Sequence, residues 1–487
     1  MSYASTVRTT LVLSAALLVG HAAQQTPRPV VLKLWHNRIA SSDSFQKEIA
    51  AFEKANPGIT VEITPTSGAQ YTQVVNLAFK SGNAPDLFVI PTDGGVTIQD
   101  AINSGWLLPL NKWATKGWQA SFPAGGFAEG VNVFDGQVYS APWASNASNY
   151  LALYINNKVF RDAGLVDRNG KVRVPRTWAE ERAFARQIVQ RSGGKTYGLG
   201  FGAKQGDYVL NIQMQSLRAS GVPAPGNTDL GYYYFNYKTG RFEFATNPRF
   251  RQWFEGWIDL KNDGALLPQS ISLNDEQIRP VFAEGRFGMY VNGGWVVPSL
   301  KQTNPGFEEY TVAPLPVRGG PSSTAYYRTI PASFELGVSS KTQHPEEAWK
   351  LFSFLNSRAS ANRWVGYGEA VRVWPETATL AKGRAGDAAR VLVSQGRVAP
   401  AFNAVRPQLA SVKFQEPTPN IEYYVLAAFS GQLKKADLPK VLKDLEDRYN
   451  AALDDAIATA RKGGSKVTRA DFTFPNWDPS KDQATVK

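Results

Sequence analysis

Apolar residues in the first hundred positions alternate between strand-like and helix-like spacing. Strands are predicted at 30–35, 59–63 and 87–90, and helices at 42–55 and 70–81. The last strand is wholly apolar, as strands buried on both faces of a parallel sheet are. Strands and helices that alternate in this order predict a parallel, doubly wound sheet with right-handed crossovers.

Helical spacing returns in the rest of the chain. Thr177 and Glu180 have the spacing of a capping box, which predicts that a helix begins there. A further strand is predicted at 151–155. The predicted helices of this part are 178–190, 208–219, 250–261, one that begins at 345, and 438–460.

The predicted topology also says where a ligand would lie. Open α/β sheets bind ligands beyond the carboxyl ends of their strands. The residues that follow the first three strands are polar and turn-like, at 36–38, 66–68 and 92–94. These loops form either a binding edge or ordinary connections between strands and helices.

The N-terminal segment has the pattern of an export signal. Arg8 is its one charged residue, an apolar run follows at 11–19, and small residues precede Ala23. The run is too short for a membrane-spanning helix, which needs about 20 apolar residues. We therefore expect residues 1–23 to be removed and the protein to be periplasmic or extracellular.

Composition excludes several classes of site. The chain has 487 residues, 43% of them hydrophobic, which suits two or three packed domains. It has no cysteine, which excludes disulfides, thiolate zinc sites, iron–sulfur clusters and a lipid-anchored N-terminal Cys. Its three histidines exclude a His-rich metal cage, whereas a calcium site built from oxygen ligands stays open.

The net charge and the number of aromatic residues each allow more than one interpretation of the ligand and the surface. The net charge is +12, but no run of five basic residues occurs, so we predict a basic surface or an anionic ligand and no nucleic-acid partner. The 13 Trp and 19 Tyr residues suit stacking on sugar rings, bases or choline-like cations, or a large core.

The sequence motifs of catalytic and cofactor-binding sites are incomplete or absent. The Gly-Lys-Thr at 194–196 lacks the first glycine of a phosphate loop, because that position is Val189. The glycines at 198–203 fit a dinucleotide fingerprint loosely, without the acidic residue about 20 positions on. No G-x-S-x-G or H-E-x-x-H occurs. We predict no catalytic residue, no cofactor and no metal, although paired carboxylates for glycoside hydrolysis stay open because such pairs are spatial.

From about residue 30 to 461 the sequence resembles the extracellular solute-binding proteins of ATP-driven importers, in their maltose-binding-protein-like, sugar-binding branch. The matching segments occur in the family's order: FEKANPGI at 52–59, GNAPDL at 82–87, SGWLLPL at 104–110, ALYINNK at 152–158, AGL at 163–165, PRTW at 175–178, GRFGM at 285–289 continuing to Trp295, and PEEA at 345–348.

The resemblance implies a two-lobed periplasmic-binding-protein fold of the α/β class. Each lobe would be a doubly wound, mostly parallel sheet, with the ligand in the cleft between the lobes. The first lobe would be 28–142 with 291–330, and the second 143–290 with 331–462. We expect the polar tail, 463–487, to pack loosely.

The resemblance also implies a function. Such a protein binds a sugar, here an oligosaccharide, as a monomer and delivers it to the membrane permease subunits of an ABC importer, without turnover. Alternatives stay open: another polar solute such as a sugar phosphate or a polyamine, or an exported carbohydrate-active enzyme. The crossing after Pro142 is about two residues longer than in maltose binders and the loop at 221–237 is rich in Tyr, so the sugar stays unnamed.

Binding residues follow from the resemblance position by position. Asp93 matches a carboxylate that accepts sugar hydroxyls, and Trp295 matches a ring that stacks on a sugar face; a turn-capping Asp and a core Trp are the alternatives. The other candidate ligand-binding residues lie in strand-end loops or near the expected crossings: His36, Asn37, Arg38, Ser67, Trp143, Gln205, Asp207, Tyr208, Tyr327 and Arg328.

Overall fold

The computed structural model describes Met1 and residues 29–92, 96–143, 151–204, 214–223, 234–319, 326–329, 333, 335–400 and 406–483. Apart from Met1, the predicted export signal lies outside these residues, and Tyr327 and Arg328 are described by their backbone alone. Four predicted binding residues also lie outside them: Asp93, Gln205, Asp207 and Tyr208.

The first lobe is built on a four-stranded sheet in the order β13-β3-β1-β2. β1 (Val30–His36) lies between β2 (Ile59–Pro65) and β3 (Leu87–Val89) and is parallel to both. β13 (Leu336–Val338) joins the edge beside β3 in the antiparallel direction. This lobe is therefore the doubly wound, mostly parallel sheet that the sequence predicts.

The first helix of this lobe buries the face that its spacing predicts. In α1 (Ser42–Ala55), Phe45, Ile49 and Phe52 are buried, and α2 (Gly68–Ser81) ends at Gly82, whose φ of 78° is left-handed. The other helical segments of this lobe are η1 (Ile39–Ser41), α3 (Ile98–Asn103), α4 (Lys116–Gln119), α12 (Pro345–Leu355) and α13 (Arg358–Gly366).

The second lobe has its own four-stranded sheet in the order β11-β6-β10-β7. β10 (Phe287–Gly293) is parallel to β7 (Tyr197–Leu199), whereas β6 (Leu151–Asn156) is antiparallel to both β10 and β11 (Tyr310–Ala313). Among the described strands this sheet is thus mixed, which differs from the mostly parallel sheet expected in each lobe.

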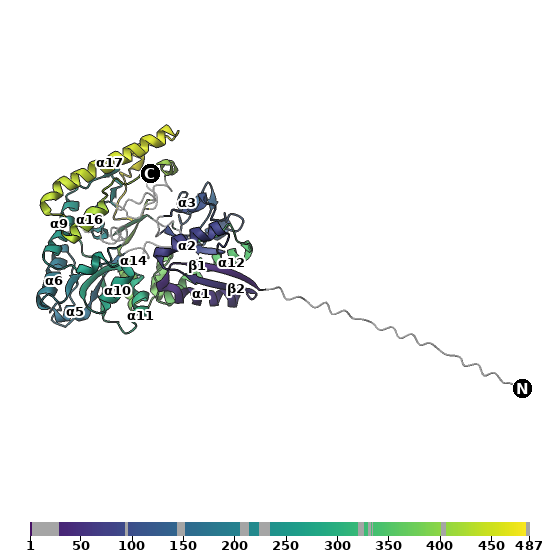
Figure 1. The fold of residues 1–487 in the computed structure, drawn as a ribbon, viewed down its shortest axis with the longest axis horizontal. Helices are drawn as coiled ribbons and strands as arrows, with labels where there is room; N and C mark the ends of the chain where they lie inside the picture. The colour runs from purple at the N-terminus through teal and green to yellow at the C-terminus, as the bar shows by residue number, and fades with distance from the viewer. Residues whose placement is uncertain are drawn as a thin grey trace.

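Helices of the second lobe flank this sheet and extend to the far edge of the molecule, where the long yellow helix α17 lies (Figure 1). The capping box at Thr177 and Glu180 opens α6, as predicted. These helices are α5 (Asn157–Asp162), α6 (Trp178–Arg191), α8 (Gln215–Ala219), α9 (Pro248–Asn262), α10 (Asp275–Ala283), α11 (Val296–Thr303), α14 (Gly383–Gln395), α16 (Ile421–Ser430) and α17 (Leu438–Lys462).

Short elements complete the fold. Three strand pairs stand apart from the two main sheets: β4 (Val133–Phe134) with β5 (Gln137–Val138), β8 (Phe235–Asn236) with β9 (Arg241–Phe242), and β12 (Tyr326–Thr329) with β14 (Gly396–Ala399). The remaining 3-10 turns are η3 (Pro268–Ile271), η4 (Pro375–Leu380), η5 (Pro407–Ser411), η6 (Lys435–Asp437) and η7 (Arg469–Phe472).

Two later segments of the chain, 291–315 and 336–374, each lie in the lobe opposite to the one predicted for them. The apolar core of the first lobe draws its buried residues from 32–141 and 336–374, and the second core from 151–315 and 388–477. Strands β10 and β11 lie beside β6, so 291–315 belongs to the second lobe; β13 lies beside β3, so 336–374 belongs to the first.

The C-terminal segment packs tightly, contrary to the expected loose tail. Phe472, Phe474 and Trp477 are each buried in the core of the second lobe. The Trp477 ring lies 5.7 Å from the Tyr237 ring, centroid to centroid. Burial of three aromatic side chains outweighs the polar character of the surrounding sequence.

Two features do not occur in the part of the chain that the structure describes: a membrane-spanning helix and a metal-binding cluster. Within that part of the chain, no helix is both long enough and apolar enough to cross a membrane. The same residues hold no group of three or more His, Asp and Glu side chains that could bind a metal ion.

Candidate functional site

The predicted binding edge lies where the order of the first sheet reverses. The chain passes from β1 to β2 on one side and then to β3 on the other, which makes the carboxyl ends of β1 and β3 the topological switch point. The Tyr71 hydroxyl lies 3.0 Å from the Trp35 carbonyl oxygen and 2.9 Å from that of Val89, between these two ends. Asn37 and Arg38 follow directly on β1 at this point.

His36, the last residue of β1, is enclosed rather than exposed to a ligand. Its ring is 0% exposed and stacks on Phe45 at 4.5 Å between centroids. Burial, and then the positive charge of Arg38, lower the pKa of His36 to about 4, so the ring is neutral at pH 7. Its neighbour Asn37 is also buried. Both residues are therefore buried beneath the predicted binding surface and are not exposed on it.

Arg38 forms a two-pronged ion pair with Glu335. Its Nε donates to Glu335 Oε1 at 2.6 Å and its Nη2 to Oε2 at 3.1 Å. The Glu335 backbone carbonyl also accepts from the Ile90 N–H at 2.9 Å. The pair thus fixes the loop after β1 to the segment that leads into β13. Sequence reasoning missed Glu335, because 297 residues separate it from Arg38 and nothing local marks it.

Trp143 ends the described part of the first crossing and stacks on a buried cation. The Arg372 guanidinium carbon lies 3.6 Å from the centre of the Trp143 ring and 4.1 Å from that of Trp364. Burial lowers the pKa of Arg372 to about 9. The backbone N–H of Trp143 donates to Ser333 Oγ at 3.0 Å, which joins the first crossing to the second. One face of the ring is therefore occupied by Arg372, a residue that the sequence did not single out.

Ser67 lies beside the same strand ends. It is the N-cap residue of α2, and it is exposed. The preceding residue, Thr66, donates its backbone N–H to the His36 carbonyl at 2.9 Å. The structure therefore places Ser67 next to the loop that carries Arg38, as predicted from the strand order.

Trp295 belongs to the second lobe, at the start of α11 and just after β10. Its ring lies over Gly293: a Cβ at position 293 would be 2.1 to 2.4 Å from three of the ring carbons. No side chain larger than hydrogen fits there without moving the ring. The Trp295 side chain is half-buried, so part of it stays available for contact.

The two halves of the candidate site meet through η1 and α11. η1, which follows Arg38, packs against α11, which follows Trp295. The Glu369 carboxylate accepts from Ser41 Oγ at 2.8 Å and from Ser44 Oγ at 2.7 Å. Next to Glu369, Ala370 faces Gly294: a Cβ at Gly294 would be 3.5 Å from the Ala370 Cβ. Residues from both lobes therefore converge here, as a site between lobes requires.

This arrangement suits non-covalent recognition. Trp143 and Trp295 are half-buried rings on opposite lobes, and such rings stack on flat apolar faces of ligands. The Arg38–Glu335 pair offers both donors and acceptors while carrying no net charge. His36, neutral and enclosed, is not placed to exchange protons with a ligand.

The sequence matches a known protein family over most of its length. The sequence model of the family described as "Bacterial extracellular solute-binding protein" matches residues 38–362, more than half of the chain. The chain belongs to this family. This solute-binding protein therefore shares a family with binding proteins, not with enzymes, as the sequence predicted.

Relatives at low identity agree with this assignment. A protein of Brucella abortus strain 2308, named only as a binding protein, is 26% identical over 313 residues, or 64% of this chain and 68% of its own. The multiple sugar-binding protein of Streptococcus mutans is 24% identical over 359 residues, covering 73% of this chain and 78% of its own.

Solved structures share the two-lobed α/β fold. An ABC transporter solute-binding protein of Thermotoga lettingae, bound with α-D-tagatose, aligns at a TM-score of 0.60 and 20% identity over 87% of this chain and 100% of its own. The maltotriose-binding protein of Thermus thermophilus aligns at 0.59 and 18% over 86% and 99%. The predicted fold class is confirmed.

Proposed function

We propose that this solute-binding protein captures a carbohydrate, specifically an oligosaccharide, between its two lobes. The observation that carries the proposal is the pair of half-buried rings on opposite lobes: Trp143, which stacks over Phe45 of α1, and Trp295, at the start of the helix α11 that packs against η1. Aromatic faces on both sides of a ligand suit the flat apolar faces of sugar rings. The sugar-binding relative and the sugar-bound structural neighbours support the same choice of ligand.

The proposal extends to partners and location. The protein is exported to the periplasm or the cell exterior, works as a monomer, and hands its ligand to the membrane permease subunits of an ABC importer. It binds without converting the ligand. Support comes from the family, whose members are extracellular solute-binding proteins.

Within the site we assign stacking to Trp295 and Trp143, and hydrogen bonding to sugar hydroxyls to Asp93 and Arg38. Carboxylates and guanidinium groups make charge-assisted hydrogen bonds that select for ligand geometry. Asn37 and His36 support the loop from behind, in line with their burial. We also propose that the remaining candidate residues contact the sugar: Ser67, Gln205, Asp207, Tyr208, Tyr327 and Arg328.

A thermal-shift screen tests the choice of ligand class. The panel comprises neutral mono- and oligosaccharides, uronates, sugar phosphates and polyamines. A ligand at 100 times its Kd adds about 2.7 kcal/mol to stability, which moves the melting temperature by several degrees. We expect a neutral oligosaccharide to give the largest shift. A larger shift with a sugar phosphate or polyamine overturns the sugar assignment.

The charge at the site argues against an anionic solute. Arg38, Arg328 and the basic net charge are the features that favour a phosphorylated or acidic sugar, and of these Arg38 has its guanidinium paired with Glu335. Turnover is tested separately, by recovering the best ligand after incubation and comparing it with a sample kept without protein. Protein-dependent conversion of the ligand would favour a carbohydrate-active enzyme instead.

A further inference from the structure

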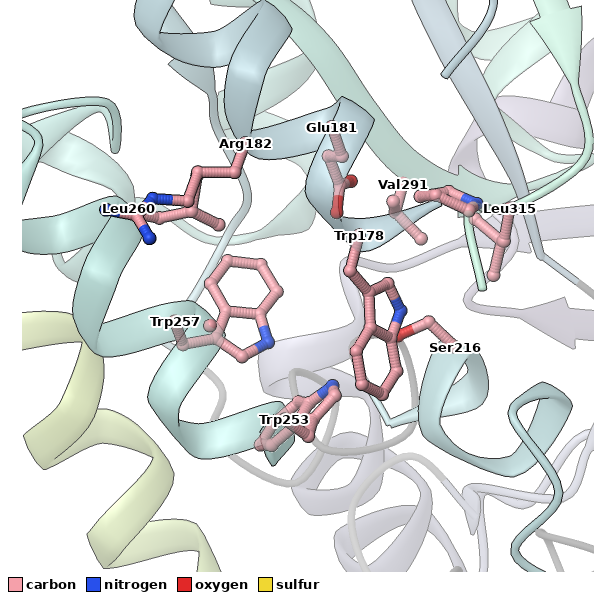
Figure 2. Close-up of a pocket in the computed structure, with 11 residues that line it drawn as sticks. Trp178, Glu181, Arg182, Ser216, Trp253, Trp257, Leu260, Val291 and Leu315 are labelled. Atoms are coloured by element: carbon pink, nitrogen blue, oxygen red, sulfur yellow. The ribbon is translucent and has the colours of Figure 1, made fainter. Parts of the chain in front are cut away.

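A pocket in the second lobe contains none of the predicted binding residues (Figure 2). Its walls include three tryptophans: Trp178 at the start of α6, and Trp253 and Trp257 one turn apart on α9. The rings of Trp253 and Trp257 lie 6.0 Å apart at 65°, which makes two walls of a corner. The cavity volume is about 50 Å³, several times the roughly 10–15 Å³ that one water needs.

One carboxyl group faces these rings. Glu181 is 9% exposed, and Figure 2 shows its side chain directed into the space between Trp178 and Trp257. Burial alone raises the pKa of Glu181 to about 8. A buried acid that no neighbouring charge stabilises is costly to ionise, so an occupant with positive charge would make a large electrostatic difference there.

Two hydrogen-bond donors at the pocket are also unsatisfied. Among the described residues, neither Trp178 Nε1 nor Trp253 Nε1 has a hydrogen-bond partner, although both atoms are buried. Buried donors in folded proteins are nearly always paired with protein, water or ligand. A bound molecule with an oxygen acceptor would satisfy one of them.

The charged groups near Glu181 form ion pairs with one another. Arg182 lines the same pocket, and its guanidinium bonds to Asp259 at 2.7 Å and to Asp263 at 2.5 Å. Lys435 bonds to Asp259 at 2.5 Å, and Arg186 lies 4.0 Å from Asp263. Glu181 is therefore, of the described residues that line the pocket, the carboxyl whose pKa burial raises.

We propose that this pocket is a second binding site, for a small hydroxylated ammonium compound of the choline or ethanolamine class. The three indole rings attract the cationic head by cation–π interaction, with Glu181 as its counter-charge. The hydroxyl oxygen accepts a hydrogen bond from an indole N–H. Ionised Glu181 favours the bound state, so binding releases a proton from this carboxyl at neutral pH.

Choline and its neutral analogue 3,3-dimethylbutan-1-ol are the probes, because they share shape and hydroxyl but differ in charge. Binding to the full chain is followed by tryptophan fluorescence and calorimetric titration, with and without a saturating sugar. We expect the neutral alcohol to bind at least about tenfold more weakly than choline. Equal binding of the two, or no binding of choline at millimolar concentration, overturns the proposal.

Substitution of Glu181 tests whether its carboxylate is the counter-charge of the bound ammonium group. Glu181→Gln keeps the shape and the neutral state that this carboxyl already has at pH 7, so the fold is retained. We expect choline affinity to fall about tenfold or more, and its rise between pH 6.5 and 8 to disappear. Glu255→Gln, on α9 in a pair with Arg251, is the matched control and leaves choline binding unchanged. A loss that is equal in both variants overturns the assignment.

Trp253→Phe tests the hydrogen bond separately from the charge. The variant keeps an aromatic wall but removes the indole N–H. We expect it to weaken choline more than tetramethylammonium, which has the charge and no hydroxyl. Equal weakening of both cations, in Trp253→Phe and in the matching Trp178→Phe variant, contradicts the proposed hydrogen bond. Sugar binding is unaffected in each variant, so failure of this site and failure of the sugar site are distinguishable.

Discussion

At the residue scale, the contact between Gly293 and Trp295 controls how the second lobe presents its aromatic ring. Trp295→Ala removes the stacking face, which contributes about 0.5–1.5 kcal/mol beyond the area it buries, so we expect sugar binding to weaken about tenfold or more. Gly293→Ala should weaken binding as well, because its new Cβ would occupy the place of the ring carbons. Calorimetric titration with the best sugar measures both effects.

A core tryptophan provides the control for this prediction. Trp106 is 8% exposed and stacks on Phe79 at 5.2 Å between centroids. Trp106→Ala should cost about 3–5 kcal/mol in urea unfolding and leave sugar affinity unchanged in the folded fraction. Half-buried Trp295→Ala should cost clearly less. Normal sugar binding by Trp295→Ala, together with early unfolding, would mean that this ring is core.

His36 gives the stability of the protein a specific dependence on pH. Its pKa is about 4 when folded and 6.5 when unfolded, so between these values the unfolded state binds more protons. The contribution of His36 is complete above pH 6.5 and is lost as pH falls toward 4. From pH 7 to 5 we expect the wild type to lose about 2 kcal/mol more than His36→Phe.

Urea unfolding of the wild type and His36→Phe across this pH range measures the difference. Phenylalanine keeps a ring of similar size against Phe45 and cannot titrate. Other groups, such as Glu181 and Glu369, titrate in both proteins and cancel in the comparison. Parallel stability curves for the two proteins would show that His36 titrates normally in the fold.

Residues that follow a strand could be predicted as candidate site residues, whereas their partners in the fold could not. Arg38 and Ser67 are candidates because they follow strands, and Trp143 because it lies near an expected crossing. Glu335 and Arg372 lie hundreds of positions away, and only the fold brings them to Arg38 and Trp143. A charge that pairs at such separation leaves no periodic pattern along the chain.

At the element scale, local signals predicted helices well and strand partners poorly. The spacing of buried residues and the capping box fix helices such as α1 and α6 within one or two residues. By contrast, β11 and β13 are short apolar runs that would fit the edge of either sheet. Their pairing is settled by the tertiary fold, so the expected lobe boundaries were wrong for these later segments.

The C-terminal segment yields a prediction at this scale. Trp477 is 1% exposed, and the Asp482 carboxylate accepts from the Val398 N–H of β14 at 2.7 Å, which ties the segment to the second lobe. Trp477→Ala should therefore cost about 3–5 kcal/mol in the free energy of unfolding. Tyr423→Ala, at a 55% exposed position, should change it by less than about 0.5 kcal/mol. Equal, small effects in urea unfolding would mean that the segment is loosely attached.

At the scale of the whole molecule, chain crossings connect two lobes that have separate cores. One crossing leaves Trp143, a second enters at Glu335, and a third runs through η4 to α14. A few connecting segments between rigid bodies suit hinge closure around a ligand. The Arg38–Glu335 and Trp143–Ser333 contacts lie on the first lobe's side of these crossings, so closure can leave them intact.

Ligand can drive closure only by binding the closed form more tightly than the open form. A shift from 1:99 to 99:1 needs roughly a 10⁴-fold difference in affinity. We expect a sugar that contacts Trp143 and Trp295 at once to have such a preference, because the two rings belong to different lobes. We expect X-ray scattering to give a smaller radius of gyration at saturating sugar. Trp295→Ala, saturated with the same sugar, should close less, since the second lobe then contributes one fewer contact. If scattering of the wild type stays unchanged while calorimetry confirms saturation, the sugar binds without closure and the two rings do not share it.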